Sequence, residues 1–228
     1  MKPNDFLYGR AQDVLKRWSR SGIQEFVMQS IGELPTNSKH ILVIGGYGPI
    51  SSFIEREYNE QEITTLDINP DFRPEIVADL ASPNLANSIN LRFDIIILVE
   101  VLEHISDFGI ALQNIKSLLN QGGVLVGTTP WSTPLHDKPV DFFRFTYFQL
   151  EKSLLDLGFV DINIECRGNL LDTIIYLGLR GLKSWGLKGK LIFCLFAPIS
   201  LLMSKPKRYV EIQDSCIGYS FVAHKKSH

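Results

Sequence analysis

The sequence predicts a doubly wound α/β fold, with a mostly parallel sheet of seven strands, helices on both faces and an antiparallel last strand. Two observations support this prediction. Short apolar runs alternate with segments of helical spacing between residues 39 and 165, and several runs end in a glycine or an acid. The run at residues 93–99 is almost wholly apolar, as is typical of a central parallel strand that is buried on both faces.

The expected elements follow in chain order. We expect strands at residues 41–44, 63–66, 75–78, 93–99, 123–128, 159–165 and 216–224, and helices at residues 50–58, 108–120 and 146–157. One or two helices are also expected within residues 5–32. Gly122 and Gly123 are expected to end the helix at 108–120, and Thr146 is expected to cap the next helix. The last strand alternates loosely and is expected to pair antiparallel at the sheet edge.

The length, composition and net charge of the chain limit the classes of protein to which it can belong. It has 228 residues, of which 45% are hydrophobic, enough for a full core in one elaborated domain. The net charge of -2 gives no general attraction to nucleic acid. The cysteines have no paired spacing, and the polar N-terminus has no apolar signal core. We therefore expect reduced thiols, no metal site and a cytoplasmic location.

Glycines and acids after the first three strands predict a cradle for a nucleotide-type cofactor. Gly45, Gly46 and Gly48 follow the first strand, where a glycine turn brings backbone N–H groups close to a ligand. Asp67 ends the second strand, 22 residues after Gly45, and an acid there can accept the hydroxyls of a ribose. Asp79 follows the third strand. The alternatives are a turn residue for Asp67 and a helix N-cap for Asp79.

From about Ile41 to Phe159, the chain resembles class I methyltransferases that depend on S-adenosylmethionine, which have a Rossmann-like sheet. The resemblance rests on FDIIILVEVLEHI at residues 93–105, GGVLVGTTP at residues 122–130, and the acids of LDINPDF and VADL. It implies that Gly45, Gly46 and Gly48 flank the methionine part of S-adenosylmethionine and that Asp67 holds its ribose. It places Asp79 and Leu80 beside the adenine, and Glu100 between cofactor and substrate.

Two departures from that family suggest a second hypothesis. The family usually has an acid two residues before the first glycine, where this chain has Val43, and its glycines usually alternate, whereas here they read Gly-Gly-Tyr-Gly. The alternative is therefore a non-catalytic protein with a degenerate methyltransferase fold. A nicotinamide dehydrogenase is the remaining enzyme class, and the motifs at residues 93–105 and 122–130 favour a methyltransferase over it.

The segment PWSTPLHDKPVDFFRFT, residues 130–146, follows the fifth strand and is expected on the ligand side of the sheet. It resembles the substrate loop of a type 11/23-like branch of these methyltransferases, with the form H-x-x-P-x-D-F-F-R-F-T. We expect His136 to act as a base near neutral pH, and Asp141, Phe143 and Arg144 to contact the substrate. The alternative is a structural Asp141–Arg144 ion pair under aromatic rings. His104 is a second candidate base, or a histidine bonded to a backbone carbonyl.

Residues 166–214 interrupt the alternation of strands and helices. We therefore divide the chain into an N-terminal helical segment (1–38), a core (39–165 and 215–228) and a basic, apolar insertion (166–214). Between Thr173 and Val210 there are seven basic residues and no acid. Such a segment can cover the cleft as a lid, or it can contact anionic lipids through residues 170–208.

The sequence therefore predicts methyl transfer from S-adenosylmethionine to an oxygen of a small-molecule, glycan or lipid-linked acceptor. The alternatives are the non-catalytic protein and a peripheral enzyme at the inner membrane face that acts on a lipid substrate.

Overall fold

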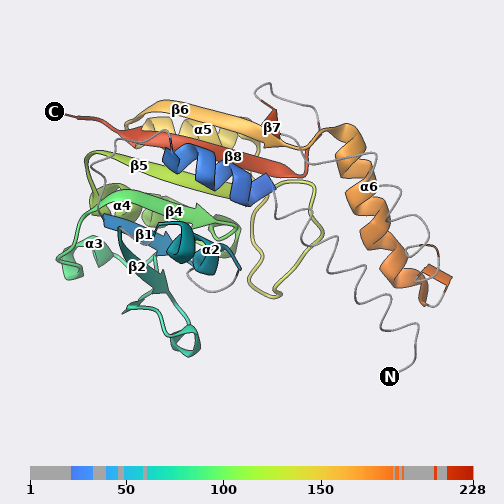
Figure 1. The fold of residues 1–228 in the computed structure, drawn as a ribbon, viewed down its shortest axis with the longest axis horizontal. Helices are drawn as coiled ribbons and strands as arrows, with labels where there is room; N and C mark the ends of the chain where they lie inside the picture. The colour runs from blue at the N-terminus through green and yellow to red at the C-terminus, as the bar shows by residue number, and fades with distance from the viewer. Residues whose placement is uncertain are drawn as a thin grey trace.

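The computed structural model describes residues 22–32, 40–45, 49–58, 61–186, 188–189, 192, 208–209 and 215–227. Within these residues the chain forms one sheet with the strand order β3-β2-β1-β4-β5-β8-β6-β7 (Figure 1). The strands are β1 (His40–Ile44), β2 (Glu62–Asp67), β3 (Ile76–Val77), β4 (Phe93–Val99), β5 (Leu119–Pro130), β6 (Phe159–Arg167), β7 (Arg208–Tyr209) and β8 (Gly218–Lys225). The seven predicted strands are present, and the two-residue β7 adds an eighth.

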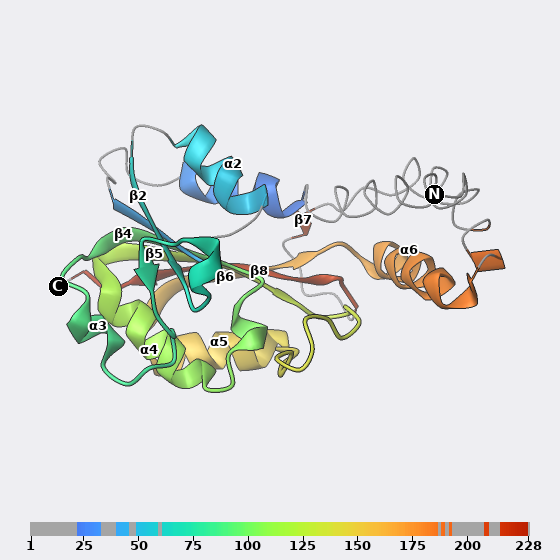
Figure 2. The same cartoon turned by 90° about the horizontal axis from the view of Figure 1, so that it is seen from below.

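Helices cover both faces of this sheet (Figure 2). The helices are α2 (Pro49–Glu57), α3 (Leu85–Ser88), α4 (Phe108–Leu118), α5 (Tyr147–Asp156) and α6 (Leu170–Gly181), with short 3-10 turns η1 (Pro70–Phe72), η2 (Leu102–His104) and η3 (Leu182–Trp185). Residues 22–32 are also helical. The helix at 22–32 and α2 lie on one face of the sheet, and α4 and α5 lie on the other.

The two faces bury alternate residues of each strand, which explains the apolar runs in the sequence. In β1, Ile41 and Val43 pack with Val27 and Ile54 on the side of α2. Leu42 and Ile44 pack into the larger core on the other side. Because β1 is covered on both faces, its side chains are apolar at successive positions, as buried parallel strands require. Val43, which stands where the resembled family has an acid, is thus a buried core residue in this chain.

The last strand lies inside the sheet rather than at its edge, which corrects the sequence prediction. β8 pairs antiparallel with β5 and also antiparallel with β6. Phe221 of β8 is fully buried, and an added Cβ at Gly127 of β5 would lie 2.2 Å from its ring. The loose alternation of this strand therefore reflects burial between two neighbours and not the half-exposed position of an edge strand.

The helix predicted at residues 108–120 ends earlier. α4 begins after Asp107, whose side chain accepts a hydrogen bond from Ile110 N, and it ends at Leu118. Gly122 and Gly123 lie inside β5, where the register with β4 shifts. The glycines therefore belong to an irregular start of the strand. Thr146 caps α5 as predicted, since its hydroxyl accepts a hydrogen bond from Gln149 N.

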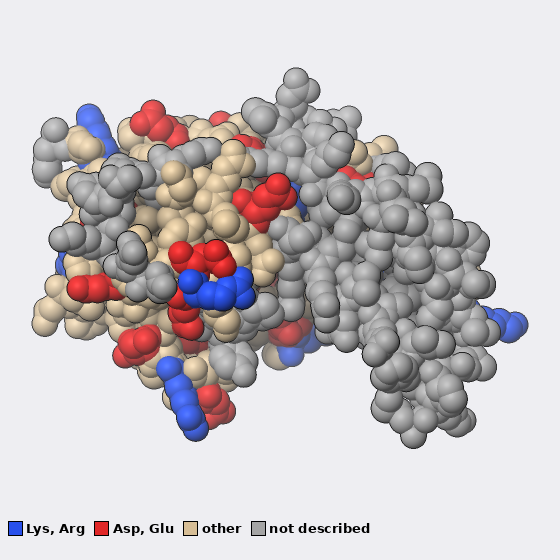
Figure 3. Space-filling model, viewed as in Figure 1, with Lys and Arg blue, Asp and Glu red and all other residues tan. Residues whose placement is uncertain are grey.

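The predicted insertion begins within the end of β6 and continues into α6, which extends away from the sheet at the end where β5 and β6 terminate (Figures 1 and 2). Among the described residues, no helix has the length and apolar character that would be needed to cross a membrane. Acidic and basic side chains are interspersed over the described part of the face in Figure 3.

Candidate active site

A cavity of about 320 Å³ lies at the carboxyl ends of the parallel strands. Five chain segments line it: Ile44 and Gly45 at the end of β1, Leu66 to Ile68 at the end of β2, Ala78 to Ala81 after β3, Val101 and His104 to Ser106 after β4, and Val140 with Phe142 from the loop after β5. This is the position at which doubly wound sheets bind their ligands. Most of the lining is aliphatic or aromatic, while Asp67, Asp79 and His104 supply polar groups.

Gly45 turns the chain out of β1 at the floor of this cavity. Its φ is +73°, and an added Cβ would lie 2.4 Å from Cγ2 of Val101. Its N–H donates to the carbonyl of Leu66, which ties the ends of β1 and β2 together. Glycine is therefore required here for both backbone conformation and space. The predicted cofactor residues Gly46 and Gly48 lie outside the described residues.

Asp67 and Asp79 line the same cavity from neighbouring strand ends. Asp67 Oδ1 accepts a hydrogen bond from Asn69 N at 2.8 Å, and Asp79 Oδ1 accepts one from Ala81 N at 2.9 Å. Each carboxylate is thus fixed by its own turn. The helix-cap alternative for Asp79 fails, because α3 begins at Leu85 and its N-cap is Asn84. Leu80, also predicted at this site, is a buried part of the cavity wall.

Glu100 does not lie with its side chain between cofactor and substrate, where the resemblance would place it. It has a φ of +51°, and its Oε1 accepts from Thr128 Oγ1 at 2.9 Å and from Arg167 Nη1 at 3.2 Å. It is not among the residues that line the cavity. Glu100 therefore links the ends of β4, β5 and β6, beside the cavity rather than in it.

Arg144 and Asp141 hold the loop at residues 131–146 in shape. Arg144 donates to both carboxylate oxygens of Asp141, at 2.5 and 2.8 Å. Its remaining N–H groups donate to the carbonyls of Thr133 and Phe143. All five guanidinium donors are thus used inside the loop, which supports the structural alternative over direct substrate contact. The Arg144 guanidinium holds the pKa of Asp141 well below its usual range.

The two neighbouring phenylalanines of this loop divide between core and cavity. Phe143 packs against Phe108 and Phe145, with ring centroids 5.2 and 5.5 Å apart. Phe142 is half exposed and lines the cavity. The predicted substrate residue Phe143 therefore points into the core, and Phe142 is the aromatic group that a ligand meets. The backbone N–H groups of both donate to the carbonyl of Glu103, at 2.9 and 3.3 Å.

The two predicted bases come together beside Glu103. The rings of His104 and His136 lie 4.9 Å apart, edge to face. Glu103 Oε1 lies 3.6 Å from His104 Nε2 and 3.7 Å from His136 Nε2. Glu103 is fully buried, and burial raises the pKa of its carboxyl. Its carboxylate in turn raises the pKa of His136. We call Glu103, His104 and His136 the rim cluster, because His104 also lines the cavity.

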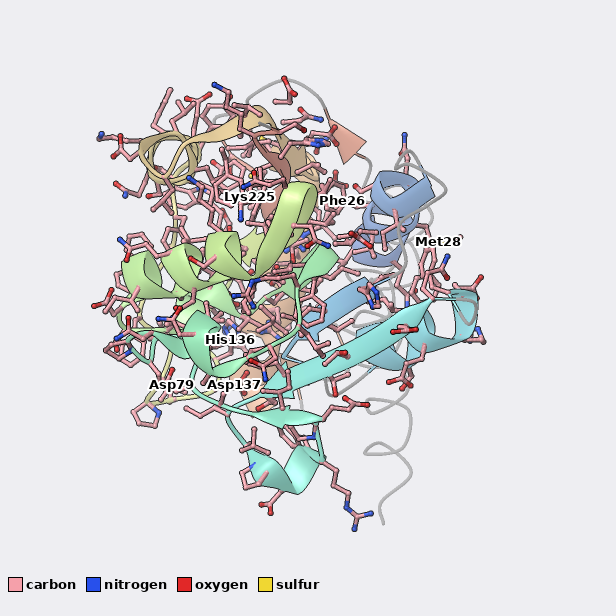
Figure 4. All side chains as sticks on the ribbon, turned by 90° about the vertical axis from the view of Figure 1, so that its left-hand side faces the viewer. Phe26, Met28, Asp79, His136, Asp137 and Lys225 are labelled. Atoms are coloured by element: carbon pink, nitrogen blue, oxygen red, sulfur yellow. The ribbon has the colours of Figure 1, made fainter. Side chains whose placement is uncertain are left out.

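His104 is oriented by a hydrogen bond on its other ring nitrogen, and His136 is held through its backbone N–H. His104 Nδ1 lies 2.7 Å from the carbonyl oxygen of Val140, as one of its two predicted alternatives required. His136 Nδ1 lies 3.3 Å from Asp141 Oδ2, and its backbone N–H donates to the same oxygen at 2.8 Å. Figure 4 views this region from the side, with Asp79, His136 and Asp137 labelled. The loop thus positions both imidazoles.

Sequence reasoning missed Glu103, although it quoted the motif that contains it. A buried acid next to a histidine just after a central strand was the available signal. The sequence does not show that this acid is buried, because acids are almost never fully buried unless they are paired. Val101 and Ile105 of the same motif were missed as well. Apolar residues just after a strand end can form the wall against which the adenine ring of a cofactor packs.

Comparison with known proteins identifies the family of this chain. A family model described as a methyltransferase domain matches residues 16–159. This chain belongs to that family of methyltransferase domains. It is an enzyme, and its cofactor is S-adenosylmethionine. No curated protein matches the chain.

Solved structures similar to this chain share its fold at low sequence identity. A methyltransferase from Archaeoglobus fulgidus that depends on S-adenosylmethionine has 17% identity and a TM-score of 0.58, covering 90% of this chain and 94% of its own. The plantazolicin methyltransferase BamL, in complex with a triazolic desmethylPZN analogue and S-adenosylhomocysteine, has 12% identity and a TM-score of 0.58, covering 98% of this chain and 90% of its own. Phosphoethanolamine N-methyltransferase 2 of Haemonchus contortus has 14% identity and a TM-score of 0.53, and the match covers 92% of this chain and 52% of that enzyme.

The cavity residues fit an adenosyl group. Leu66, Ile68 and Leu80 provide an apolar wall of the kind that a purine needs, and Asp67 provides an acceptor for sugar hydroxyls at the end of β2. Gly45 adds no side chain to the cavity and lies against the side chain of Val101. When bound, S-adenosylmethionine supplies an electrophilic methyl group on a sulfonium.

Proposed function

We propose that this methyltransferase methylates an oxygen of a small-molecule, glycan or lipid-linked acceptor that lies against the rim cluster. The observation that supports this is the position of His104, which belongs both to the wall of the cofactor cavity and to the rim cluster. A hydroxyl is a weak nucleophile until its proton is removed or its charge is stabilised. Two imidazoles beside a carboxylate can do this near neutral pH.

In the simplest mechanism, the proton of the acceptor hydroxyl passes to His136. The buried carboxylate of Glu103 then stabilises the imidazolium, as the raised pKa of His136 indicates. Val140 and Phe142 close one side of the cavity, so that they exclude water and align the acceptor with the cofactor. Asp141 and Arg144 act by holding this loop in place, rather than by touching the acceptor.

The experiment is a transfer assay with S-adenosylmethionine labelled in its methyl carbon. Hydroxylated small molecules, glycans and lipid-linked acceptors are tested in parallel, and the carbon shift of the product identifies the methylated atom. We expect a methyl bound to oxygen, and we expect His136→Asn to lower kcat by about 10²- to 10⁴-fold. His40→Asn is the control, because His40 pairs with Glu62 at the start of β1. Transfer to nitrogen or carbon alone would overturn the proposal.

A lipid-linked acceptor at the inner membrane face is a second candidate, supported by α6. Leu170, Ile174 and Leu177 recur on one side of this helix, and with Trp185 they expose between 39% and 65% of their surface. Arg180 and Lys188 provide positive charge nearby in the sequence. An exposed apolar row with basic neighbours suits the interface of an anionic bilayer. In this version the enzyme acts from the cytoplasm and docks through residues 170–208.

A further inference from the structure

The carboxylate of Glu103 is buried without a hydrogen-bond donor. Its side chain is fully buried, and neither Oε1 nor Oε2 has a hydrogen-bond partner. Burial of a charged carboxylate costs several kcal/mol unless a partner compensates for the lost water. The groups that face Glu103 Oε1 are the two imidazoles, at 3.6 and 3.7 Å, and both distances are too long for hydrogen bonds.

The imidazole of His104 presents a lone pair toward that carboxylate, and His136 turns its Nε2 toward it as well. His104 Nδ1 lies 2.7 Å from the carbonyl oxygen of Val140. A carbonyl only accepts, so Nδ1 carries the proton, and in the neutral ring Nε2 keeps its lone pair. His136 Nδ1 also faces a carboxylate, that of Asp141 at 3.3 Å, although it makes no hydrogen bond to it, and its Nε2 is directed at Glu103. Histidines that bind metals are usually oriented in this way by a carbonyl or a carboxylate on the other nitrogen.

We propose that Glu103, His104 and His136 bind a divalent transition-metal ion. One ligand atom from each residue lies within 4.8 Å of the other two. Ligands at about 2.0–2.1 Å around a tetrahedral ion lie about 3.3 Å apart. The observed separations of 3.6 and 3.7 Å from Glu103 Oε1 therefore need to shorten by only a few tenths of an ångström, while the ligand nitrogens of the two imidazoles, which lie within 4.8 Å of each other, must also close to about 3.3 Å. A bound cation removes the unpaired charge of Glu103.

The ligand set selects the class of ion. Two imidazole nitrogens and one carboxylate oxygen suit Zn²⁺, Mn²⁺, Fe²⁺ or Co²⁺, whereas Ca²⁺ and Mg²⁺ prefer oxygen ligands. Three protein ligands leave a coordination position open. Because His104 also lines the cavity, that position lies at its rim, where the proposed function places the acceptor oxygen. A bound ion would take the place of His136 as the group that activates the acceptor hydroxyl, because His136 is then a ligand. This role of the ion rests on the proposed function, but its binding does not.

The site forms only in the folded loop, which explains why the sequence predicted no metal. Glu103 and His104 are adjacent in the chain, but His136 is 32 residues further on and lacks any familiar metal-binding spacing. The backbone bonds from Phe142 and Phe143 to Glu103, together with the Asp141–Arg144 pair, bring His136 into position.

The test uses the full chain, purified without a histidine tag, treated with chelator and titrated with Co²⁺ alone. We expect one cobalt per chain by elemental analysis, a visible absorption band, and displacement of cobalt by Zn²⁺. Glu103→Gln and His136→Asn should each lower the affinity by at least about 10-fold, while His40→Asn, the surface histidine paired with Glu62, should bind as the wild type does. Circular dichroism verifies that each variant is folded, and His104→Asn replaces any variant that is not.

Three results would overturn the site: no cobalt uptake by the folded wild type, uptake that is unchanged in two folded variants of the rim cluster, or a thiolate charge-transfer band. Methyl transfer is measured separately. Cobalt binding without transfer to any hydroxyl supports the metal site and counts against the proposed function. Transfer to a hydroxyl by a protein that binds no cobalt overturns the metal site and leaves the proposed function in place.

Discussion

Gly45 is a position in the cavity where an added side chain has no room. An added methyl group would lie 2.4 Å from Val101 Cγ2 at a φ of +73°. We predict that Gly45→Ala destabilises the protein by about 2–3 kcal/mol and weakens cofactor binding, because both the turn and the cavity floor must move. Urea unfolding measures the first effect. Gly109→Ala is the control, since its Cβ would find only Asp107 Oδ1 at 3.5 Å. Equal losses in the two variants would contradict this account.

The Asp141–Arg144 pair makes a prediction about pH. Hydrogen bonds from Arg144 lower the pKa of Asp141 in the folded protein below its unfolded value of about 3.9. The pair therefore contributes stability that is fully present above about pH 4 and is lost as the pH falls toward the folded pKa. Asp141→Asn should cost about 2 kcal/mol at pH 7, and the difference from wild type should shrink below pH 4 in urea unfolding. A difference that stays constant with pH would contradict a charged structural pair.

The sequence could predict those site residues whose role follows from position on a strand. Asp67 and Asp79 end neighbouring parallel strands, and such ends meet at one edge of the sheet, so both line the cavity. It could not predict which phenylalanine of the loop faces the ligand. Phe142 and Phe143 are identical in type and adjacent in the chain. Which of them faces the cavity depends on the conformation of the loop where both backbone N–H groups donate to the carbonyl of Glu103. This contact joins residues that are far apart in the sequence, so the local sequence pattern does not show which ring faces the ligand.

At the scale of elements, burial pattern located the strands well but did not give their order. β4 was predicted at residues 93–99 and has those bounds. Its long apolar run is typical of a strand that is buried on both faces, so the sequence pattern identified it clearly. β8 was predicted as an antiparallel strand, but at the edge. Its place between β5 and β6 depends on the return of the chain after α6, which no local periodicity records.

The exposed row of α6 leads to a prediction about membranes. Ile174 lies between Leu170 and Leu177 on this helix and is exposed. If α6 docks on lipid, Ile174→Glu should reduce co-sedimentation with anionic vesicles at low salt several-fold. Leu155→Glu, a change at a similarly exposed leucine on α5, should have little effect. Equal pelleting of the three proteins, or none for the wild type, would remove the lipid-docked version of the function.

At the scale of the whole molecule, the sheet gathers residues that are far apart in the sequence at one edge. Gly45, Asp67, Asp79 and His104 come from four different strand ends, and the loop after β5 closes over them. The same topology places the rim cluster next to the cofactor cavity. Family membership establishes a methyltransferase. We propose that the cavity holds the adenosyl group and that the rim cluster presents the acceptor.

The central claim is that this cavity binds S-adenosylmethionine through Asp67. Isothermal titration calorimetry of the wild type, Asp67→Ala and Asp71→Ala tests it most directly. Asp71 is the matched control, because it lies in η1, four residues after Asp67, and does not line the cavity. We predict one cofactor per chain, with affinity lowered about 10- to 100-fold by Asp67→Ala and unchanged by Asp71→Ala. Wild-type affinity in Asp67→Ala, or no heat with folded wild type, would contradict the account.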